Sequence, residues 1–340
     1  MKKLELAKLD GFFRAVSAVM PLYLPADDAA GQASFTRYEP GVRLSERGNT
    51  VRSAKDLFFP QMENLVDFKV SGKSIEILEH RNVSEDFVIF GVRACDAAGF
   101  EILDRVFLSD PVDGYYQERR EHGIIVTMAC GAPEETCFCS VFGIDAADPR
   151  GDVTAWKTGD HVCFRANTEK GEKLLALAEL EDGGEEAVAE AQRATRAILE
   201  KLPLKDLDLT GFDGEHMMEK FRDPRWGELS EACLGCGTCT FVCPTCRCYD
   251  VREFHTGDTI QRFRCWDSCM YSDFTKMSAG QPRPTQMERF RQRFMHKLVY
   301  FPANNDGIYG CVGCGRCLQK CPIHMNIVKV AKTIGGASHA

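Results

Sequence analysis

The chain has 340 residues and a formal net charge of −8, from 42 basic and 50 acidic side chains. A net-acidic protein is a poor candidate for non-specific nucleic-acid binding, which needs Lys and Arg to neutralise phosphates. No apolar run approaches the roughly 18 residues of a membrane helix, so no membrane insertion is expected. Hydrophobic residues make up 44% of the chain, enough for sizeable cores in two or three domains. Cysteine is unusually abundant, with 17 residues, twelve of them from Cys233 to Cys321.

The N-terminal segment predicts an amphipathic helix rather than a signal peptide. Asp10 and Arg14 interrupt the apolar stretch that a signal peptide needs. Hydrophobic side chains instead recur at helical spacing, at Leu6, Leu9, Phe13, Val16 and Met20. We therefore expect a cytoplasmic protein. In that reducing compartment, dense Cys-x-x-Cys spacing indicates metal or redox chemistry rather than disulfides.

Residues 1–168 are predicted to form an α/β domain. Two short apolar runs, 86–91 and 123–128, are typical of buried parallel strands, and the segment 97–107 between them has helical periodicity. This order of elements predicts a β-α-β unit with two parallel strands. Two further strand-like runs precede the unit, at residues 67–70 and 74–78.

The rest of the chain is predicted to contain a helical connector and a second domain. Residues 169–211 form the connector, with two helices interrupted at Gly183 and Gly184. From about residue 212 the composition changes to Cys, Gly, Arg and aromatic side chains. This change predicts a second domain over residues 212–334, followed by a short polar tail at 335–340.

The strongest signal in the sequence is an internal repeat. Residues 233–244 and 311–322 both follow the pattern C-x2-C-x2-C-x3-C-P. With this spacing, three neighbouring cysteines hold one [4Fe–4S] cluster, and the fourth reaches the other cluster of a two-cluster ferredoxin. Glycines between the cysteines allow tight turns whose backbone N–H groups point at sulfur. Zinc also takes four-cysteine sites, but rarely with three evenly spaced cysteines and a Cys-Pro.

The repeat predicts two ligand sets that exchange their fourth cysteine. One cluster is expected on Cys233, Cys236, Cys239 and Cys321. The other cluster is expected on Cys311, Cys314, Cys317 and Cys243. The predicted fold class is α+β: an N-terminal α/β domain precedes a mostly helical, ferredoxin-like domain with two [4Fe–4S] clusters and a long insertion.

The insertion between the repeats holds further cysteines and many basic side chains. Its thiols are expected either to ligate a further metal or to be buried beside the clusters; they belong to Cys246, Cys248, Cys265 and Cys269. Its basic side chains would offset cluster charge, dock an acidic partner or form a solvated face. They are Arg262, Arg264, Arg283, Arg289, Arg291, Arg293 and Lys297.

A third group of cysteines is expected to meet in the α/β domain. Cys95 and Cys130 each follow one strand of the β-α-β unit, so both lie at the sheet edge where ligands bind in open α/β sheets. Cys137 and Cys139 follow in a loop long enough to fold back over that edge. We expect a third [4Fe–4S] cluster here, with a zinc site or inert buried thiols as alternatives. Cys163 is expected to be a core thiol.

Signals for other chemistry are missing from the sequence. Residues 71–74 resemble the end of a P-loop, but Asp67 occupies the position of the required first glycine. No G-x-G-x-x-G motif follows a strand, so we expect this chain to bind neither NAD nor flavin. The histidines show no ligand or triad spacing, and no catalytic residue is expected. Asp96 is expected to cap the helix that follows it.

An ordered series of motifs resembles a known family. In the first domain the motifs lie at residues 90–96 (FGVRACD), 103–107 (LDRVF), 115–119 (YYQER) and 137–139 (CFC). In the second domain they lie at residues 243–246 (CPTC), 266–269 (WDSC) and 310–317 (GCVGCGRC). The series resembles the iron–sulfur β subunits of cytoplasmic sulfhydrogenases. It is also similar to the corresponding iron–sulfur subunits of anaerobic sulfite reductases and of flavin oxidoreductase–heterodisulfide reductase complexes.

The resemblance implies an electron-transfer role and supports the third cluster. In that family the iron–sulfur chain relays electrons from a partner that binds FAD and NAD(P)H to a terminal catalytic partner, or in the reverse direction. The terminal partner is a hydrogenase, a heterodisulfide reductase or a sulfite reductase. Clusters with four cysteine ligands suit a relay, because they pass single electrons without an open coordination position. The alternatives are a redox enzyme that binds substrate directly at a cluster, and a protein whose clusters serve regulation or structure.

Overall fold

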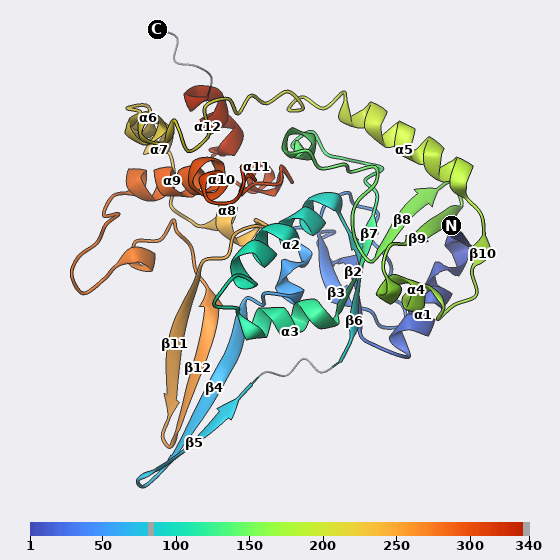
Figure 1. Ribbon diagram of the computed structural model, residues 1–340, viewed down its shortest axis with the longest axis horizontal. Coiled ribbons are helices and arrows are strands. Elements are labelled where there is room, and N and C mark those ends of the chain that lie inside the picture. The colour runs from blue at the N-terminus through green and yellow to red at the C-terminus, as the bar shows by residue number, and fades with distance from the viewer. Residues whose placement is uncertain (81–84, 336–340) are drawn as a thin grey trace.

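An eight-stranded sheet organises the N-terminal half of the computed structural model, which describes residues 1–80 and 85–335 (Figure 1). The strand order is β10-β1-β9-β8-β7-β6-β2-β3. The strands are β1 Lys2–Glu5, β2 Leu22–Asp27, β3 Ala33–Arg37, β6 Phe87–Val92, β7 Gly123–Met128, β8 Val153–Thr158, β9 His161–Ala166 and β10 Glu181–Asp182.

The predicted β-α-β unit lies at the centre of this sheet. β6 and β7 run parallel, with Val88 opposite Ile124 and Phe90 opposite Val126, and every residue of both strands is buried. Continuous burial follows from helices on both faces of the sheet, which explains the unbroken apolar runs in the sequence. The crossover helix α2, Ala94–Phe107, connects the two strands as expected.

Helices cover both faces of the sheet. On one face, α1 (Leu9–Ser17) and α4 (Glu169–Leu175) pack against alternate side chains of the central strands. On the other face lie α2 and α3 (Gly114–His122), with α5 (Glu185–Leu199) against β8. The predicted N-terminal helix is shorter than expected, because the first residues pair with β9 as strand β1.

The connector contains the two predicted helices, α4 and α5. Gly183 and Gly184 both have positive φ and directly precede α5. The first helix ends earlier than expected, at Leu175, and Glu181–Asp182 pair with β1 as strand β10. A Cβ added to Gly184 would lie 2.6 Å from the Cys163 sulfur. Cys163 is 1% exposed on β9, in agreement with the expected core thiol.

The C-terminal half is a set of short helices around a hydrophobic core. This core includes Trp226, Phe290 and Phe294. The helices are α6 Met217–Arg222, α7 Trp226–Glu231, α8 Thr238–Phe241, α9 Gln286–Met295, α10 Phe301–Ala303, α11 Arg316–Gln319 and α12 Ile327–Ile334. A π-helical turn, His296–Tyr300, joins α9 to α10. In the described part of the chain, no helix combines the length and apolarity needed to cross a membrane.

A second, four-stranded sheet projects from the molecule and joins its two halves (Figure 1). Its strand order is β11-β12-β4-β5, with β4 Met62–Ser71, β5 Ser74–Glu79, β11 Tyr249–Thr256 and β12 Thr259–Trp266. The strands expected near residues 67–78 are therefore present, but they pair with the insertion rather than with the α/β sheet. Residues 71–74 are the β4–β5 turn, where Gly72 has positive φ.

Candidate metal centres

The four cysteines of the N-terminal half line one cavity, which we call the N-terminal site. Cys95 lies in the first turn of α2, directly after β6, and Cys130 follows β7. Cys137 and Cys139 reach the same cavity from the next loop. Burial raises the pKa of Cys137 to about 11 and that of Cys139 to about 12. Metal binding at this site must therefore displace protons, because the thiolate is the ligand.

The repeat cysteines line two further cavities, grouped as the sequence predicts. The first ferredoxin site is lined by Cys233, Cys236, Cys239 and Cys321. The second ferredoxin site is lined by Cys243, Cys311, Cys314 and Cys317. Each repeat thus places three cysteines at one site, and its fourth cysteine lies at the other site.

The two repeats share one backbone conformation. Gly235 and Gly237 have φ values of 64° and 74°, and Gly313 and Gly315 have values of 59° and 75°. Only glycine adopts this left-handed region without strain. The turns direct the backbone N–H of Gly235 toward Cys233 and that of Gly313 toward Cys311, as hydrogen-bond donors to sulfur.

The glycines of the second repeat also allow the two halves to approach closely. A Cβ on Gly313 would lie 2.4 Å from the carbonyl oxygen of Phe138, and one on Gly315 would lie 2.6 Å from that of Thr136. The Phe138 N–H donates to the Gly313 carbonyl at 2.8 Å. As a result, Cys314 lines both the second ferredoxin site and the N-terminal site.

Asp96 has a different role from the helix cap expected of it. Its carboxylate receives two hydrogen bonds, at 2.5 and 2.7 Å, from Arg316, which lies between two cysteines of the second repeat. Both side chains are 1% exposed. Arg316 also donates to the carbonyl and hydroxyl oxygens of Thr50. The ion pair therefore joins the N-terminal site to the second ferredoxin site.

Two other buried cations lie among the cysteines without a carboxylate as their hydrogen-bond partner. Arg293, 2% exposed, donates to the sulfur of Cys239 at 3.0 Å and to its carbonyl at 2.8 Å, and its Nη1 has no partner. Lys297 donates to Thr245 Oγ1 and the Gly310 carbonyl. Burial alone would lower the pKa of Lys297, but the nearby sulfurs of Cys243 and Cys246 raise it.

The other basic side chains of the insertion divide between different roles. Arg264 is buried in ion pairs with Glu63 and Asp113, and it stabilises the junction of the two halves. Arg262 pairs with Glu253 at the surface. Of the three roles expected for this group, the offset of cluster charge therefore fits Arg293 and Lys297.

Three of the four insertion cysteines lie together. Cys246, Cys248 and Cys269 line one cavity with His296, whereas Cys265 lies on β12 opposite Asp250. A hydrogen bond from Cys269 lowers the pKa of Cys248 to about 6. The sequence predicts an ordinary surface or core residue at His296, because its spacing matches no ligand pattern.

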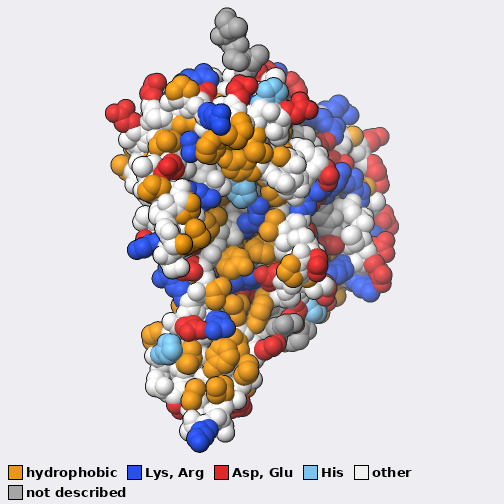
Figure 2. Space-filling model, turned by 60° about the vertical axis from the view of Figure 1, so that its left-hand side comes forward, with side chains coloured by type: hydrophobic (Ala, Val, Ile, Leu, Met, Phe, Trp, Pro, Cys, Tyr) orange, Lys and Arg blue, Asp and Glu red, His pale blue; other side chains and the backbone are white. Residues whose placement is uncertain are grey.

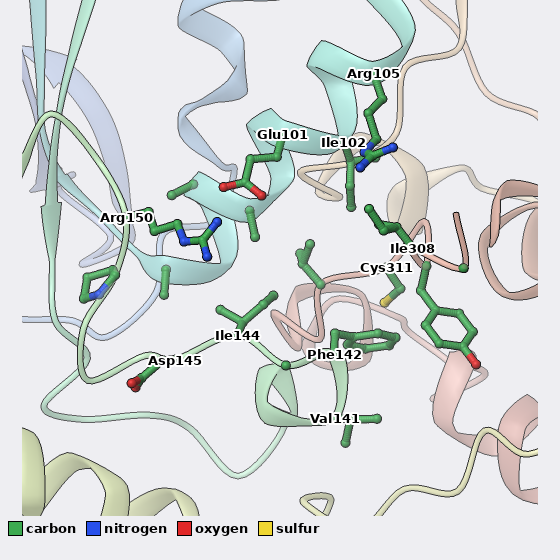
Figure 3. Close-up of a pocket in the computed structure, with 18 of the residues that line it drawn as sticks. Glu101, Ile102, Arg105, Val141, Phe142, Ile144, Asp145, Arg150, Ile308 and Cys311 are labelled. Atoms are coloured by element: carbon green, nitrogen blue, oxygen red, sulfur yellow. The ribbon is translucent and has the colours of Figure 1, made fainter. Parts of the chain in front are cut away.

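A cavity of about 570 Å³ lies between α2 and the loops around residues 141–150 and 306–312 (Figure 3). Glu101, Arg105 and Arg150 supply charges to its wall, and Ile144 and Phe142 supply apolar surface. Cys311 of the second ferredoxin site lies at its edge.

The cysteine groups surround their cavities instead of converging on one point. Within residues 1–80 and 85–335, no group of three or more His, Cys, Asp or Glu side chains is arranged to hold a single metal ion. A [4Fe–4S] cluster has a different requirement, because each thiolate binds a different iron atom. Four thiols around a cavity, with buried cations nearby that have no carboxylate as a hydrogen-bond partner, fit such a cluster.

Two interleaved four-cysteine sites define the class of this protein, an iron–sulfur protein of the two-cluster ferredoxin type. Residues 232–325 match the 4Fe-4S dicluster domain family. The chain is also 36% identical, over 249 residues, to sulfhydrogenase 2 subunit beta of Pyrococcus furiosus, an alignment that covers 72% of each chain. The chain therefore belongs to the iron–sulfur β subunit family of the sulfhydrogenases, and it is an iron–sulfur electron-transfer subunit. No solved structure matches it.

Proposed function

We propose that the chain is a cytoplasmic relay within a multi-subunit oxidoreductase. It would carry single electrons between an FAD- and NAD(P)H-binding reductase and a terminal catalytic subunit: a hydrogenase, a heterodisulfide reductase or a sulfite reductase. Three [4Fe–4S] clusters would be held by the cysteines of the N-terminal site and the two ferredoxin sites. When bound, such clusters accept and release one electron at a time.

The observation that carries this proposal is the continuous arrangement of the three sites. Cys314 lines both the N-terminal and the second ferredoxin site. Arg293 lines both the second and the first ferredoxin site. This contact order supports a linear path from the N-terminal site through the second ferredoxin site to the first.

The first ferredoxin site offers one end of this path to a partner. Cys236 is exposed, and Leu234, two residues before it, is 67% exposed. An exposed leucine beside a ligand cysteine is an apolar contact point for a redox partner. It would bring the partner's redox group near the site.

The projecting sheet offers a candidate surface for a second subunit. Val70 lies directly opposite Ile75, and Phe68 lies opposite Ile77, so these side chains share one face. Ile75 and Ile77 are 63% and 61% exposed, and Figure 2 shows hydrophobic side chains gathered on the projection. Apolar surface of this kind is typical of protein–protein contacts, which supports the assembly of this chain with other subunits.

The relay is tested by comparing the purified chain with the assembled complex under anaerobic conditions. We expect dithionite to reduce the purified chain and to produce paramagnetic signals in its EPR spectrum. We expect NADH or NADPH to leave the chain oxidised until the flavin-binding subunit is added. Turnover of NAD(P)H or of a terminal substrate by this chain alone would contradict the proposal.

Replacing Cys137 with serine tests the third cluster. We expect the variant to lose about four irons per chain, because one of the four thiolates of the N-terminal site is removed. In the complex, NAD(P)H should still reduce the flavin while the terminal reaction slows sharply. Iron and acid-labile sulfide analysis provides the measurement.

Cys163→Ser is the matched control for that experiment. Its sulfur is buried beside Thr158 and Gly184, and Cys163 does not line the cavity. An unchanged iron content in the Cys137→Ser variant, or an equal loss in both variants, would exclude a cluster at the N-terminal site.

A redox enzyme with substrate at a cluster is the second candidate, favoured by the 570 Å³ cavity that reaches Cys311 (Figure 3). Such an enzyme needs an iron with an open position, whereas Cys311 belongs to a complete set of four thiols. Substrate turnover by the isolated chain would support the enzyme over the relay.

A further inference from the structure

The Cys-x-Cys spacing occurs at two cavities of this protein. Cys137-x-Cys139 lines the N-terminal site, and Cys246-x-Cys248 lines a fourth cavity inside the insertion. We call this fourth cavity the insertion site. Its donor atoms come from four side chains, those of Cys246, Cys248, Cys269 and His296.

Three separate segments bring these four side chains together. Cys246 and Cys248 lie just before β11, and Cys269 follows β12, so the hairpin returns the chain to its starting point. The Asp267 N–H donates to the Cys248 carbonyl at 2.9 Å and fixes this closure. His296 comes from the π-helical turn after α9. Such turns are rare and are often found at functional sites.

The insertion site is similar in volume to its neighbour. The space free of protein atoms, open solvent included, is about 340 Å³ there and about 330 Å³ at the second ferredoxin site. Like the other three groups, the four side chains surround this space rather than converge on one point. The two cavities adjoin, because Cys243 of the second ferredoxin site hydrogen-bonds to Cys246.

The charges around the insertion site also match those of a cluster site. Arg293 and Lys297 line both this cavity and the second ferredoxin site, and Arg247 lines this cavity alone. Arg247 donates to the Thr245 carbonyl and to His296 Nε2 rather than to a carboxylate. Arg293 and Lys297 are buried and Arg247 is partly buried. Buried cations are costly without a negative partner, and three thiolates around an iron–sulfur core supply that negative charge.

We propose that the insertion site holds a fourth [4Fe–4S] cluster, ligated by the thiolates of Cys246, Cys248 and Cys269 and by the imidazole of His296. Thiolates and imidazole are both established ligands of iron. The cluster would lie beside the linear path, next to the second ferredoxin site. This inference goes beyond the relay, which requires only the other three sites.

The test is metal analysis and spectroscopy of the full chain prepared anaerobically. The wild type should contain about sixteen irons with matching sulfide, and Cys248→Ala/Cys269→Ala should lose about four of them. Cys265→Ser is the matched control, because Cys265 belongs to the same insertion but lies outside the cavity, and it should keep the full iron content.

A second variant tests whether His296 is a ligand, and it does not require the cluster to be removed. His296→Cys should retain all the iron, while pulsed EPR of the reduced protein should lose the ¹⁴N coupling that a coordinated imidazole produces in the wild type. Unchanged coupling in this variant, or its absence from the wild type, would overturn the proposal. So would zinc in place of iron, a Cys248–Cys269 disulfide, or undiminished iron in the double alanine variant.

A wild type with about twelve irons and normal electron transfer would refute this inference alone and leave the relay intact.

Discussion

Replacing Arg316 with methionine is expected to lower the free energy of unfolding by about 3–5 kcal/mol, the cost of removing one partner from a buried ion pair. Arg316 and Asp96 are each 1% exposed, so the carboxylate left behind has no access to water. The variant also loses the hydrogen bonds to Thr50. The midpoint of urea unfolding, followed by tryptophan fluorescence without oxygen, measures the effect.

Two further variants show whether the ion pair itself is responsible. The double variant Arg316→Met/Asp96→Leu should be more stable than the sum of the two single changes predicts, because it leaves no unpaired charge. Arg196→Met breaks a surface pair with Asp145, where both side chains are about half exposed. That change should cost at most about 1 kcal/mol. Strict additivity in the double variant would show that the two side chains are not coupled.

Replacing Arg293 with methionine is expected to lower the reduction potential of the first and second ferredoxin sites by on the order of 100 mV. A positive charge favours the added electron. For a guanidinium and an added electron roughly 7 Å apart, at an effective dielectric constant near 20, the attraction is about 2.4 kcal/mol. This energy corresponds to about 100 mV for a one-electron couple. The hydrogen bond to the Cys239 sulfur is lost as well, which acts in the same direction.

A redox titration followed by EPR measures this shift. Arg293→Lys should recover most of the potential, since it keeps the charge. Arg291→Met is the matched control: Arg291 lies on the same helix, but it stacks on Phe221 and donates to the Phe221 carbonyl. Equal shifts in the Arg291 and Arg293 variants would indicate a general effect of net charge and would contradict the specific role of Arg293.

The three cysteines that each repeat places at one site can be predicted because their spacing is local. The order C-x2-C-x2-C-x3-C-P constrains the turns themselves, and the structure places both repeats in the same conformation. The β-α-β unit can also be predicted from local sequence, since both of its strands are mostly apolar and are buried along their whole length. Both signals depend on residues that are close together in the sequence.

The features that sequence reasoning misses depend on distant contacts. Asp96 sits where a helix cap is common, and nothing nearby shows that its partner is Arg316, 220 positions away. The strand character of β4 and β5 is visible, but hydrophobic periodicity does not say which sheet a strand joins. His296 likewise has no local ligand spacing, because its neighbours at the insertion site come from other segments.

The shared four-stranded sheet has a consequence for synthesis on the ribosome. β4 pairs with β12, and 201 positions separate Glu63 from its partner Arg264. At a synthesis rate of roughly 5–20 residues per second, the edge of β4 that later pairs with β12 stays uncovered for on the order of 10–40 seconds. An unpaired strand edge is prone to aggregation, so we expect the first half of this protein to need chaperone protection, or rapid completion of the chain, until the insertion emerges.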